Sequence, residues 1–372
     1  MRHSLVHSVA LAAAALVVAL VLVACGSSNN NNSATSGGSS SGGKTVALLL
    51  PESKTARYES QDKPHFEQRL KALCPDCKVI YENADQDASK QQSQAEAAIT
   101  NGAKVLVLDP VDGKAAAAIA TRAKQAGVSV IAYDRMVESP DVKYYISFDN
   151  RRVGELQATA LVDKVRSGPI VMINGSPTDA NAAQFKAGAH SVIDKSNLKV
   201  AKEYDTPDWS PDQAQNEMQQ AITALGKSGF VAVYAANDGT AGGAIAAMKA
   251  GGVNPATKPT TGQDAELAGI QRIVAGQQYM TVYKAIKTEA EDAAQLTVDV
   301  LNDKPSSLVN QHVTNTTKAA VPSVILTPVA VTTKNISGTV VKDGFWTVNQ
   351  ICTSAYAADC KKIGLTTSSS QG

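Results

Sequence analysis

The sequence predicts an α/β protein with two doubly wound, Rossmann-like lobes, and three observations support this fold class. Short aliphatic runs alternate with Ala- and Gln-rich stretches, the order expected for buried parallel strands covered by helices. About 330 residues follow position 43, which is too long for one compact core. A helix–strand–helix–strand unit at 98–135 is paralleled at 221–264, and the second strand of each unit ends in aspartate.

Residues 1–24 have the features of a signal peptide. Arg2 precedes an apolar run over 9–24, which is short for a membrane-spanning helix. The run ends in Leu-Val-Ala before Cys25 and resembles the lipobox of bacterial lipoproteins, so we expect cleavage before a diacylated Cys25. The alternative is an uncut signal anchor in which Cys25 is an incidental thiol.

Residues 25–43 are the expected tether between the lipid and the folded body. From position 26 onward they consist of Gly, Ser, Asn, Ala and Thr, a composition that buries little apolar surface. The chain carries 35 Lys+Arg against 34 Asp+Glu and no basic block, which argues against a nucleic-acid ligand. No second apolar stretch reaches membrane-spanning length, so the acyl chains alone are expected to hold the protein at the outer face of the membrane.

Five cysteines are present, and Cys25 leaves an even number for an oxidising compartment. Proximity in sequence favours Cys74 with Cys77 and Cys352 with Cys360 among the possible pairings. The Cys-Pro-Asp-Cys segment also permits a redox-active motif, but it lacks a thioredoxin-like context. A zinc site is disfavoured by the wide spacing of Cys352 and Cys360, and no metal or cofactor is expected.

Strands and helices are assigned from periodicity and from the glycines that stop several of the helices. The expected strands are 45–50, 105–108, 128–133, 170–173 and 230–235, with a further strand following Cys77. The expected helices are 65–73, 113–126, 152–165, 212–225 and 239–250.

Polar residues follow the apolar strands, where facing lobes of this class form a cleft. They are Asp134-Arg135, Asp149-Asn150, Asp179 with Asn181, Asn237-Asp238, Gln263-Asp264 and Lys284. A polyol needs this mixture of groups, because each hydroxyl both donates and accepts hydrogen bonds. Any single Asp or Asn of this set also fits a helix N-cap or a turn. The set as a whole indicates a sugar site.

Several runs in the chain resemble the periplasmic sugar-binding proteins of ABC importers, and most closely the D-xylose-binding proteins. The runs are Tyr133–Met136, Tyr145–Asn150, Val153–Ala158, Gly175–Pro177, Asn237-Asp238, Ala241–Ile245, Gly262–Asp264, Leu267–Ile270 and Met280–Lys284. They occur in the family's order over about 45–346. Their joint occurrence is far more specific than any one of them.

The resemblance implies two lobes joined by three crossover segments near 148, 285 and 323. The implied parts are an N-terminal lobe of 44–148 plus 285–323, a C-terminal lobe of 149–284 plus 324–346, and a Cys-containing tail of 347–372. It also implies a set of sugar-binding residues, which we extend with Asp179 and with Tyr58, where the family has a second tryptophan. The full set is Arg57, Tyr58, Asp134, Arg135, Asp179, Asn181, Trp209, Asn237, Asp264 and Lys284.

Trp209 lies in a loop without apolar periodicity, and an aromatic face suits the C–H face of a pyranose. The alternative for Trp209 is a half-buried surface aromatic, whereas Trp346 is expected to serve packing. The Tyr58 departure leaves sugar selectivity open among xylose, glucose and arabinose. The cysteine segments, a second departure from the family, are expected to act as surface braces.

The expected function is that of a monomeric, exported sugar-binding lipoprotein that serves the permease of an ABC importer. A sugar sensor coupled to a membrane receptor is the alternative. An enzyme is not expected, because the histidines are scattered and no Gly-x-Ser-x-Gly elbow or glycine fingerprint is present. Paired carboxylates leave glycoside hydrolysis open to an assay on aryl-xylosides. A transcriptional regulator would need a helix-turn-helix module before position 44, where we find signal and tether.

Overall fold

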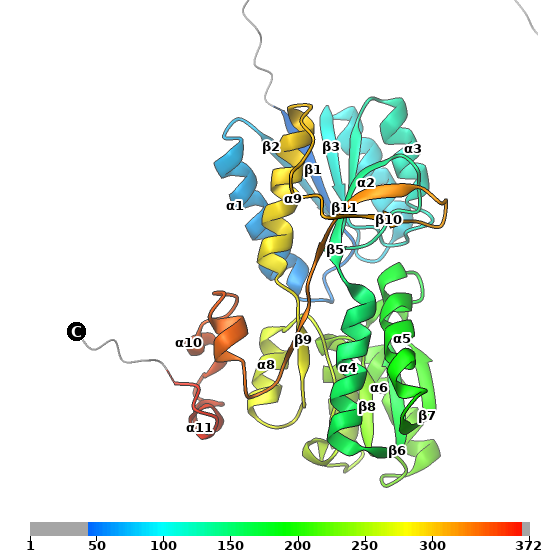
Figure 1. Ribbon diagram of the computed structural model, residues 1–372, viewed down its shortest axis with the longest axis vertical. Helices are drawn as coiled ribbons and strands as arrows, with labels where there is room; N and C mark the ends of the chain where they lie inside the picture. The colour runs from blue at the N-terminus through cyan, green and yellow to red at the C-terminus, as the bar shows by residue number, and fades with distance from the viewer. Residues whose placement is uncertain (1–43, 367–372) are drawn as a thin grey trace, which may run out of the picture. The chain divides into compact units, whose positions relative to one another are not determined.

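The computed structural model describes residues 44–366 (Figure 1). The signal peptide, Cys25 and the tether, predicted within residues 1–43, lie outside the described residues. Two sheet systems, each with helices packed against it, form two lobes within the described chain. The predicted α/β class is confirmed.

The first lobe is built on a seven-stranded sheet of order β10-β11-β5-β4-β3-β1-β2. All neighbours are parallel except β10, which is antiparallel to β11. The strands are β1 (Thr45–Leu50), β2 (Lys78–Asn83), β3 (Ala103–Leu108), β4 (Ser129–Tyr133), β5 (Val142–Phe148), β10 (Gln311–Thr314) and β11 (Ala320–Leu326).

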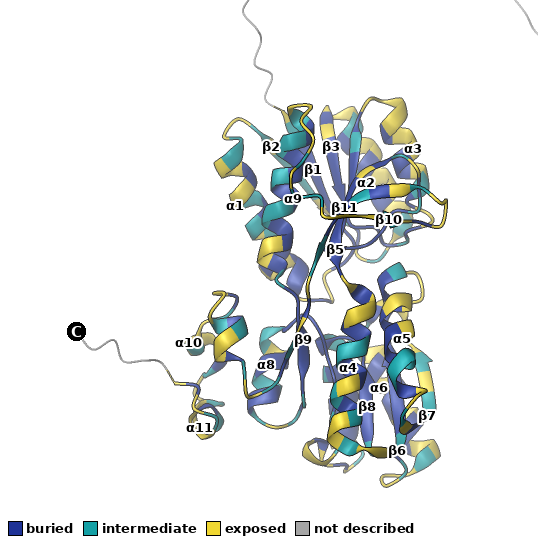
Figure 2. Ribbon diagram, viewed as in Figure 1, coloured by how far each residue is buried: buried dark blue, intermediate teal, exposed yellow. Residues whose placement is uncertain are grey.

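Helices cover both faces of this sheet, which explains why its central strands read as continuous apolar runs. In β1, Ala47 and Leu49 belong to one core cluster, whereas Leu48 and Leu50 belong to the other. The first cluster lies under α2 (Ala88–Thr100) and α3 (Ala117–Gln125), and the second under α1 (Lys63–Leu73) and α9 (Ile286–Leu301) (Figures 1 and 2).

The second lobe has a three-stranded parallel sheet of order β7-β6-β8 and an antiparallel pair, β12 with β9. Helices α4 and α5 pack against one face of β6, and α6 and α7 against the other. The strands are β6 (Ser167–Asn174), β7 (Asn197–Asp205), β8 (Ala232–Ala235), β9 (Thr281–Tyr283) and β12 (Val329–Val331). The helices are α4 (Asn150–Val165), α5 (Ala180–Ile193), α6 (Pro211–Leu225), α7 (Asp238–Ala250) and α8 (Leu267–Val274).

The chain passes between the lobes at three places: after Phe148, after Tyr283 and after Leu326. The third differs from the predicted crossing near 323, because Ser323 still pairs with Tyr145 inside the first sheet. Pairing of β11 with β5 continues as far as Leu326, so the second-lobe segment begins after that residue and not at 324.

The described part of the predicted Cys-containing tail packs onto the second lobe. Helices α10 (Val348–Ile351) and α11 (Ala357–Lys362) place Ile351, Cys360 and Leu365 in a buried cluster with Ile270 of α8. The Trp346 indole donates a hydrogen bond to the carbonyl of Ala265 (2.8 Å), in line with the packing role predicted for this residue.

Each predicted cysteine pair brings its sulfur atoms within bonding distance. The Cα atoms are 5.3 Å apart for Cys74 and Cys77 and 5.9 Å apart for Cys352 and Cys360. The cysteine side chains are half-buried against the cores, apart from Cys360, which is buried. The segment around Cys360 therefore contributes to a core and is not only a surface brace.

The predicted internal repeat is present only in part. In the first lobe both strands of the unit form, as β3 and β4. In the second lobe β8 forms, but the expected strand before Asp264 is reduced to isolated bridges of Thr260 with Val233 and of Gln263 with Val282. Within residues 44–366 no helix combines the length and the apolar character needed to cross a bilayer.

Candidate ligand-binding site

Polar side chains gather at the carboxyl ends of the strands of both lobes, the position at which open α/β sheets bind ligands. Asp134 and Arg135 follow β4, Asn237 follows β8 and Lys284 follows β9. Arg57 and Tyr58 lie beyond β1, at the start of a π-helical segment (Tyr58–Asp62) that continues into α1. The fold thus brings side chains from distant parts of the sequence to one place.

These side chains, all of them buried, line one cavity between the lobes. Every sugar-binding residue predicted from the sequence lines it. The lining also includes Gln263, one of the strand-end residues noted in the sequence, and two residues that sequence analysis did not single out, Thr55 and Phe185.

Lys284 lies at the centre of the charged groups and is almost fully buried. Its Nζ is 2.9 Å from Asp264 Oδ1 and 3.8 Å from Asp134 Oδ1. Burial opposes the ammonium charge, but the two carboxylates outweigh burial and raise the pKa of Lys284. Burial likewise disfavours the charge on Asp134, yet Arg57 and Lys284 lower the pKa of this carboxyl to about 2.

Arg57 is held by two carboxylates outside the cavity that sequence analysis missed. Asp62 accepts hydrogen bonds from Arg57 Nε (2.9 Å) and Nη2 (2.6 Å), and Glu289 of α9 accepts from Nη2 (2.6 Å). The Tyr133 hydroxyl donates to Asp62 from the other side. With Nε and Nη2 engaged in this way, Nη1 faces Asp134 (3.3 Å) and Asp264 (3.8 Å) at the cavity.

Tyr58, which stands where the resembling proteins have a tryptophan, takes part in the charged network. Its hydroxyl donates to Asp134 Oδ2 (3.2 Å) and accepts from Arg135 Nη2 (3.1 Å). A tryptophan has no acceptor for the arginine. The replacement therefore gives this wall of the cavity a hydroxyl that connects Asp134 and Arg135.

Trp209 is buried and forms an aromatic wall of the cavity, so it is not a half-buried surface aromatic. Its ring meets Phe185 edge-on, with ring centroids 6.2 Å apart, and Nε1 donates to Asp179 Oδ2 (3.1 Å). The six-membered ring lies directly over Gly175, at a point where any Cβ would overlap it. A residue larger than glycine at 175 is therefore incompatible with this ring position.

Three site residues have left-handed backbone conformations that non-glycine residues rarely adopt: Asp134 (φ 52°), Trp209 (φ 54°) and Asp264 (φ 82°). Each such conformation costs about 1–3 kcal/mol, and residues in such conformations cluster at functional sites. The surrounding strand ends hold these residues in place, as when Ser147 and Tyr145 donate hydrogen bonds to the Asp134 carbonyl.

Two buried side-chain oxygens at the cavity, Asn181 Oδ1 and Gln263 Oε1, have no hydrogen-bond partner among the described residues. Arg57 Nη1, Asp134 Oδ1 and Asp264 Oδ1 also lack a hydrogen bond of normal geometry, but they take part in the ion pairs described above. Buried polar groups in proteins are nearly always hydrogen-bonded. A ligand that offers both donors and acceptors would satisfy this mixture of oxygen atoms and a guanidinium group.

The N-cap interpretation of the strand-end residues also holds for part of the set. Asp149, Asp179 and Asn237 cap α4, α5 and α7 through their side chains. Asn237 Oδ1 accepts from the Thr240 amide, so its amide group remains for the cavity. Capping and ligand binding are thus compatible at this position.

Asp238 supports the loop that carries Asp264. It accepts hydrogen bonds from the Glu266 amide (2.9 Å), the Thr281 hydroxyl (3.0 Å) and Gln278 Nε2 (2.6 Å). Burial raises the pKa of Asp238 from 3.8 to about 7, although Arg272 opposes the shift. Asp238 is therefore a supporting residue behind the cavity.

This shift predicts a pH-dependent stability. Since the folded state keeps a proton that the unfolded state loses, the free energy of unfolding should fall as pH rises from about 4 to about 7, by up to about 1.4 kcal/mol per pH unit. Asp238→Asn cannot ionise and should lack this slope. Urea unfolding of both proteins across this range measures the difference, and parallel curves would contradict the prediction.

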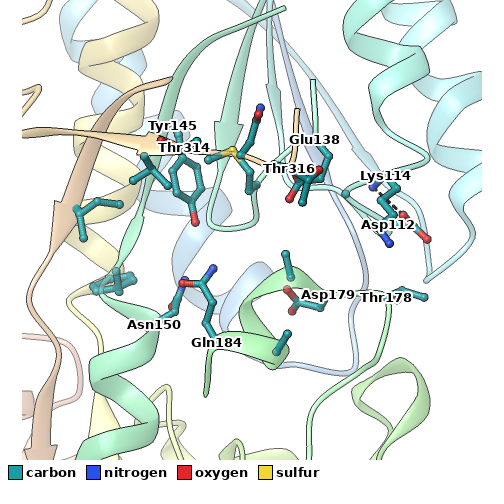
Figure 3. Close-up of a pocket in the computed structure, with 18 of the residues that line it drawn as sticks. Asp112, Lys114, Glu138, Tyr145, Asn150, Thr178, Asp179, Gln184, Thr314 and Thr316 are labelled. Carbon is teal, nitrogen blue, oxygen red and sulfur yellow. Dashed lines mark hydrogen bonds between the residues drawn. The ribbon is translucent and has the colours of Figure 1, made fainter. Parts of the chain in front are cut away.

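A second, larger groove lies beside the cavity, also between the lobes (Figure 3). Figure 3 shows Lys114 and Glu138 of the first lobe on one side and Gln184 of the second lobe on the other. Asp179 is the one residue that lines both this groove and the buried cavity. Asp149 and Asn150, polar residues noted in the sequence, line the groove and not the cavity.

Within residues 44–366 no group of three or more His, Cys, Asp or Glu side chains is arranged to hold a metal ion.

Two α/β lobes that enclose a small polar cavity at their strand ends define a ligand-binding protein of the periplasmic type. Comparison with known proteins identifies the family: the Periplasmic binding protein domain matches residues 46–305. The chain belongs to this family and has the fold of the family. Membership of a periplasmic family implies that the protein is exported.

Among curated proteins, the chain is 40% identical to the D-xylose-binding periplasmic protein of Escherichia coli over 307 residues, which cover 81% of this chain and 90% of the relative. It is 38% identical to the D-xylose-binding periplasmic protein of Haemophilus influenzae over 311 residues, covering 82% and 91%. These relatives are binding proteins and not enzymes, in agreement with the sequence analysis.

Among solved structures, a solute-binding protein of an ABC transporter from Clostridium phytofermentans, with bound β-D-glucose, superposes with a TM-score of 0.76. It is 29% identical, and the match covers 83% of this chain and 100% of that one. Both comparisons span nearly the whole length of the matched proteins.

Proposed function

We propose that this protein captures a monosaccharide, D-xylose in the first place, in the cavity between its lobes and delivers it to the permease of an ABC importer. The buried polar atoms that converge on the cavity, several of them without a hydrogen bond of normal geometry among the described residues, carry this proposal. They combine acceptors with a guanidinium donor beside the Trp209 ring, and this combination matches the hydroxyls and the C–H face of a pyranose. The D-xylose-binding relatives support the choice of sugar.

We further propose roles within the predicted site set. Arg57, Tyr58, Asp134, Arg135, Asn181, Trp209, Asn237, Asp264 and Lys284 contact the sugar. Asp179 differs from these residues, because both of its carboxylate oxygens already contact protein groups. The proposed lobe division follows the three observed crossings, after Phe148, Tyr283 and Leu326.

Selectivity between pentoses and hexoses decides the substrate. Because xylose lacks the hydroxymethyl group of glucose, a cavity shaped for the pentose excludes the hexose by steric overlap. Titration calorimetry of the protein without residues 1–43 against D-xylose, D-glucose and L-arabinose tests this. Equal affinity for glucose, as the glucose-bound structural relative would allow, removes the pentose assignment. Absence of binding to any aldose removes the sugar-binding function.

We propose that Cys25 carries the lipid that anchors the protein at the membrane. Two acyl chains are needed for stable attachment, so Cys25→Ser should release the protein from the membrane fraction and abolish fatty-acid labelling. Labelling that persists in this variant would refute the lipobox assignment.

We propose that the protein released from the membrane is a monomer. Sedimentation analysis tests this oligomeric state.

We also propose that Cys74–Cys77 and Cys352–Cys360 are disulfides in the exported protein. Their sulfur positions and an oxidising compartment support this. Peptide mapping without reductant should recover both cross-linked pairs, and free thiols at all four positions would contradict the proposal. Sugar affinity should change little when either bridge is lost, because neither pair lines the cavity.

A further inference from the structure

Arg135 is fixed in the first lobe by three partners of that lobe. Its Nη2 donates to the Tyr58 hydroxyl (3.1 Å), its Nη1 donates to the Pro110 carbonyl (3.3 Å), and its Nε lies 3.5 Å from Asp109 Oδ1. The side chains of Arg135 and Asp109 are buried. The guanidinium group is therefore already oriented before it meets any residue of the second lobe.

Asp179 is the residue of the second lobe that meets this guanidinium group. Its Oδ2 lies 3.1 Å from Arg135 Nε and also accepts the indole hydrogen bond of Trp209 (3.1 Å). Its Oδ1 accepts from the Asn181 amide (2.8 Å) and so caps α5. One carboxylate thus connects the first lobe, the aromatic wall of the cavity and the start of a helix.

The place of this ion pair gives it a second role. Asp179 lines both the buried cavity and the larger groove of Figure 3, where it stands at the start of α5. Asp179 therefore lies between the cavity and the groove, and Arg135 meets it from the cavity side. A direct hydrogen bond between the lobes, from Asn181 Nδ2 to the Asp134 carbonyl (2.9 Å), lies beside it.

We propose that Asp179 is a positioning residue that clasps the two lobes together and fixes the Trp209 ring, and that it does not hold the sugar itself. The proposal rests on the sugar-binding function proposed above. When the lobes meet, Arg135 and Trp209 share the same carboxylate oxygen. The Trp209 hydrogen bond lies within the second lobe, and the Arg135 ion pair joins the same oxygen to the first lobe.

The test uses Asp179→Asn, because asparagine remains a good N-cap while it loses the charge and one acceptor oxygen. We expect binding of D-xylose to weaken by roughly 30-fold or more, the range for loss of one partner of a buried charged pair. Asp87→Asn is the matched control: Asp87 caps α2 in the same way but lies outside the cavity. It should bind as wild type, and both variants should keep the unfolding temperature of the sugar-free protein.

Deoxy analogues of D-xylose, each lacking one hydroxyl, separate a positioning role from direct contact. A positioning residue weakens the parent sugar and every analogue by the same factor. If the factor disappears for one analogue, Asp179 holds that hydroxyl and the proposal falls. Wild-type affinity in Asp179→Asn, or a lowered unfolding temperature beyond that of Asp87→Asn, also overturns it.

Small-angle scattering of the sugar-free proteins provides an arm that is independent of the ligand. Loss of the clasp should increase the average radius of gyration of Asp179→Asn over that of wild type. If the wild-type protein binds no aldose, the proposed function fails, but the scattering comparison still tests the contact between the lobes. Equal radii of gyration for wild type and Asp179→Asn would overturn the proposal.

Discussion

Replacement of Lys284 by methionine should weaken sugar binding by a factor of roughly 30 or more, since removal of one partner of a buried charged hydrogen bond typically costs about 2–5 kcal/mol. Methionine keeps the length of the side chain but leaves the Asp264 carboxylate buried, with Arg57 at 3.8 Å as its remaining cation. Asp264→Ala should cause a loss of similar size from the other side of the pair. Titration calorimetry measures both.

Lys287→Met is the matched control for this experiment. Lys287 lies one turn further along the chain, is about half exposed and pairs with Glu291 at 4.0 Å. Exposed pairs of this kind contribute about 0–1 kcal/mol, so the control should keep wild-type affinity. If Lys284→Met also binds sugar as wild type does, the central ammonium group has no part in recognition.

Substitution of Gly175 by alanine should displace the Trp209 ring and weaken binding at least as much as Trp209→Ala does. The added Cβ would overlap three atoms of the six-membered ring. For Trp209→Ala we expect a loss of about 1–3 kcal/mol, or about 5- to 150-fold. Gly175→Ala should lose the same contact between the Trp209 ring and the sugar, and the displaced ring adds steric bulk.

Gly338→Ala serves as the control, because a Cβ there meets no atom within 4 Å. Trp209 fluorescence gives a second measurement, with Trp346 as the constant background of the other tryptophan. An unchanged emission spectrum and unchanged affinity in Gly175→Ala would contradict the ring position described here.

The strand-end residues of the site could be predicted from the sequence because they follow strong apolar runs. Asp134, Asn237 and Lys284 stand directly after or near such strands. Family resemblance supplied Trp209, whose loop carries no periodic signal. The cavity then collects all of the predicted residues, although only ligand-binding measurements can test their role.

The carboxylates behind Arg57 were not predicted, for a physical reason. Glu289 lies in the helical run Thr-Glu-Ala-Glu-Asp, whose composition is typical of a solvent-exposed surface. Its burial arises from a partner 232 residues away in the chain. Pairing of this range leaves no local pattern.

The short polar strand β10 and the single bridge at Thr260 show the same limit in the fold. Residues Gln311–Thr314 are mostly exposed and have no apolar alternation. They form a strand because the edge of β11 is available to them. Sequence periodicity predicts strands whose side chains pack into a hydrophobic core. It does not detect strands that form only because a neighbouring strand offers an edge for pairing.

The late entry of β11 into the first sheet determines the order in which the protein is able to fold during synthesis. Ser323 pairs with Tyr145, and α9 covers a sheet whose central strands were made long before it. Until residues 286–326 leave the ribosome, the β5 edge and one face of that sheet are uncovered. Domains usually fold as units during synthesis, and long-range strand pairing is slow. The first lobe therefore cannot complete its sheet or cover both of its faces until these late residues have been synthesised.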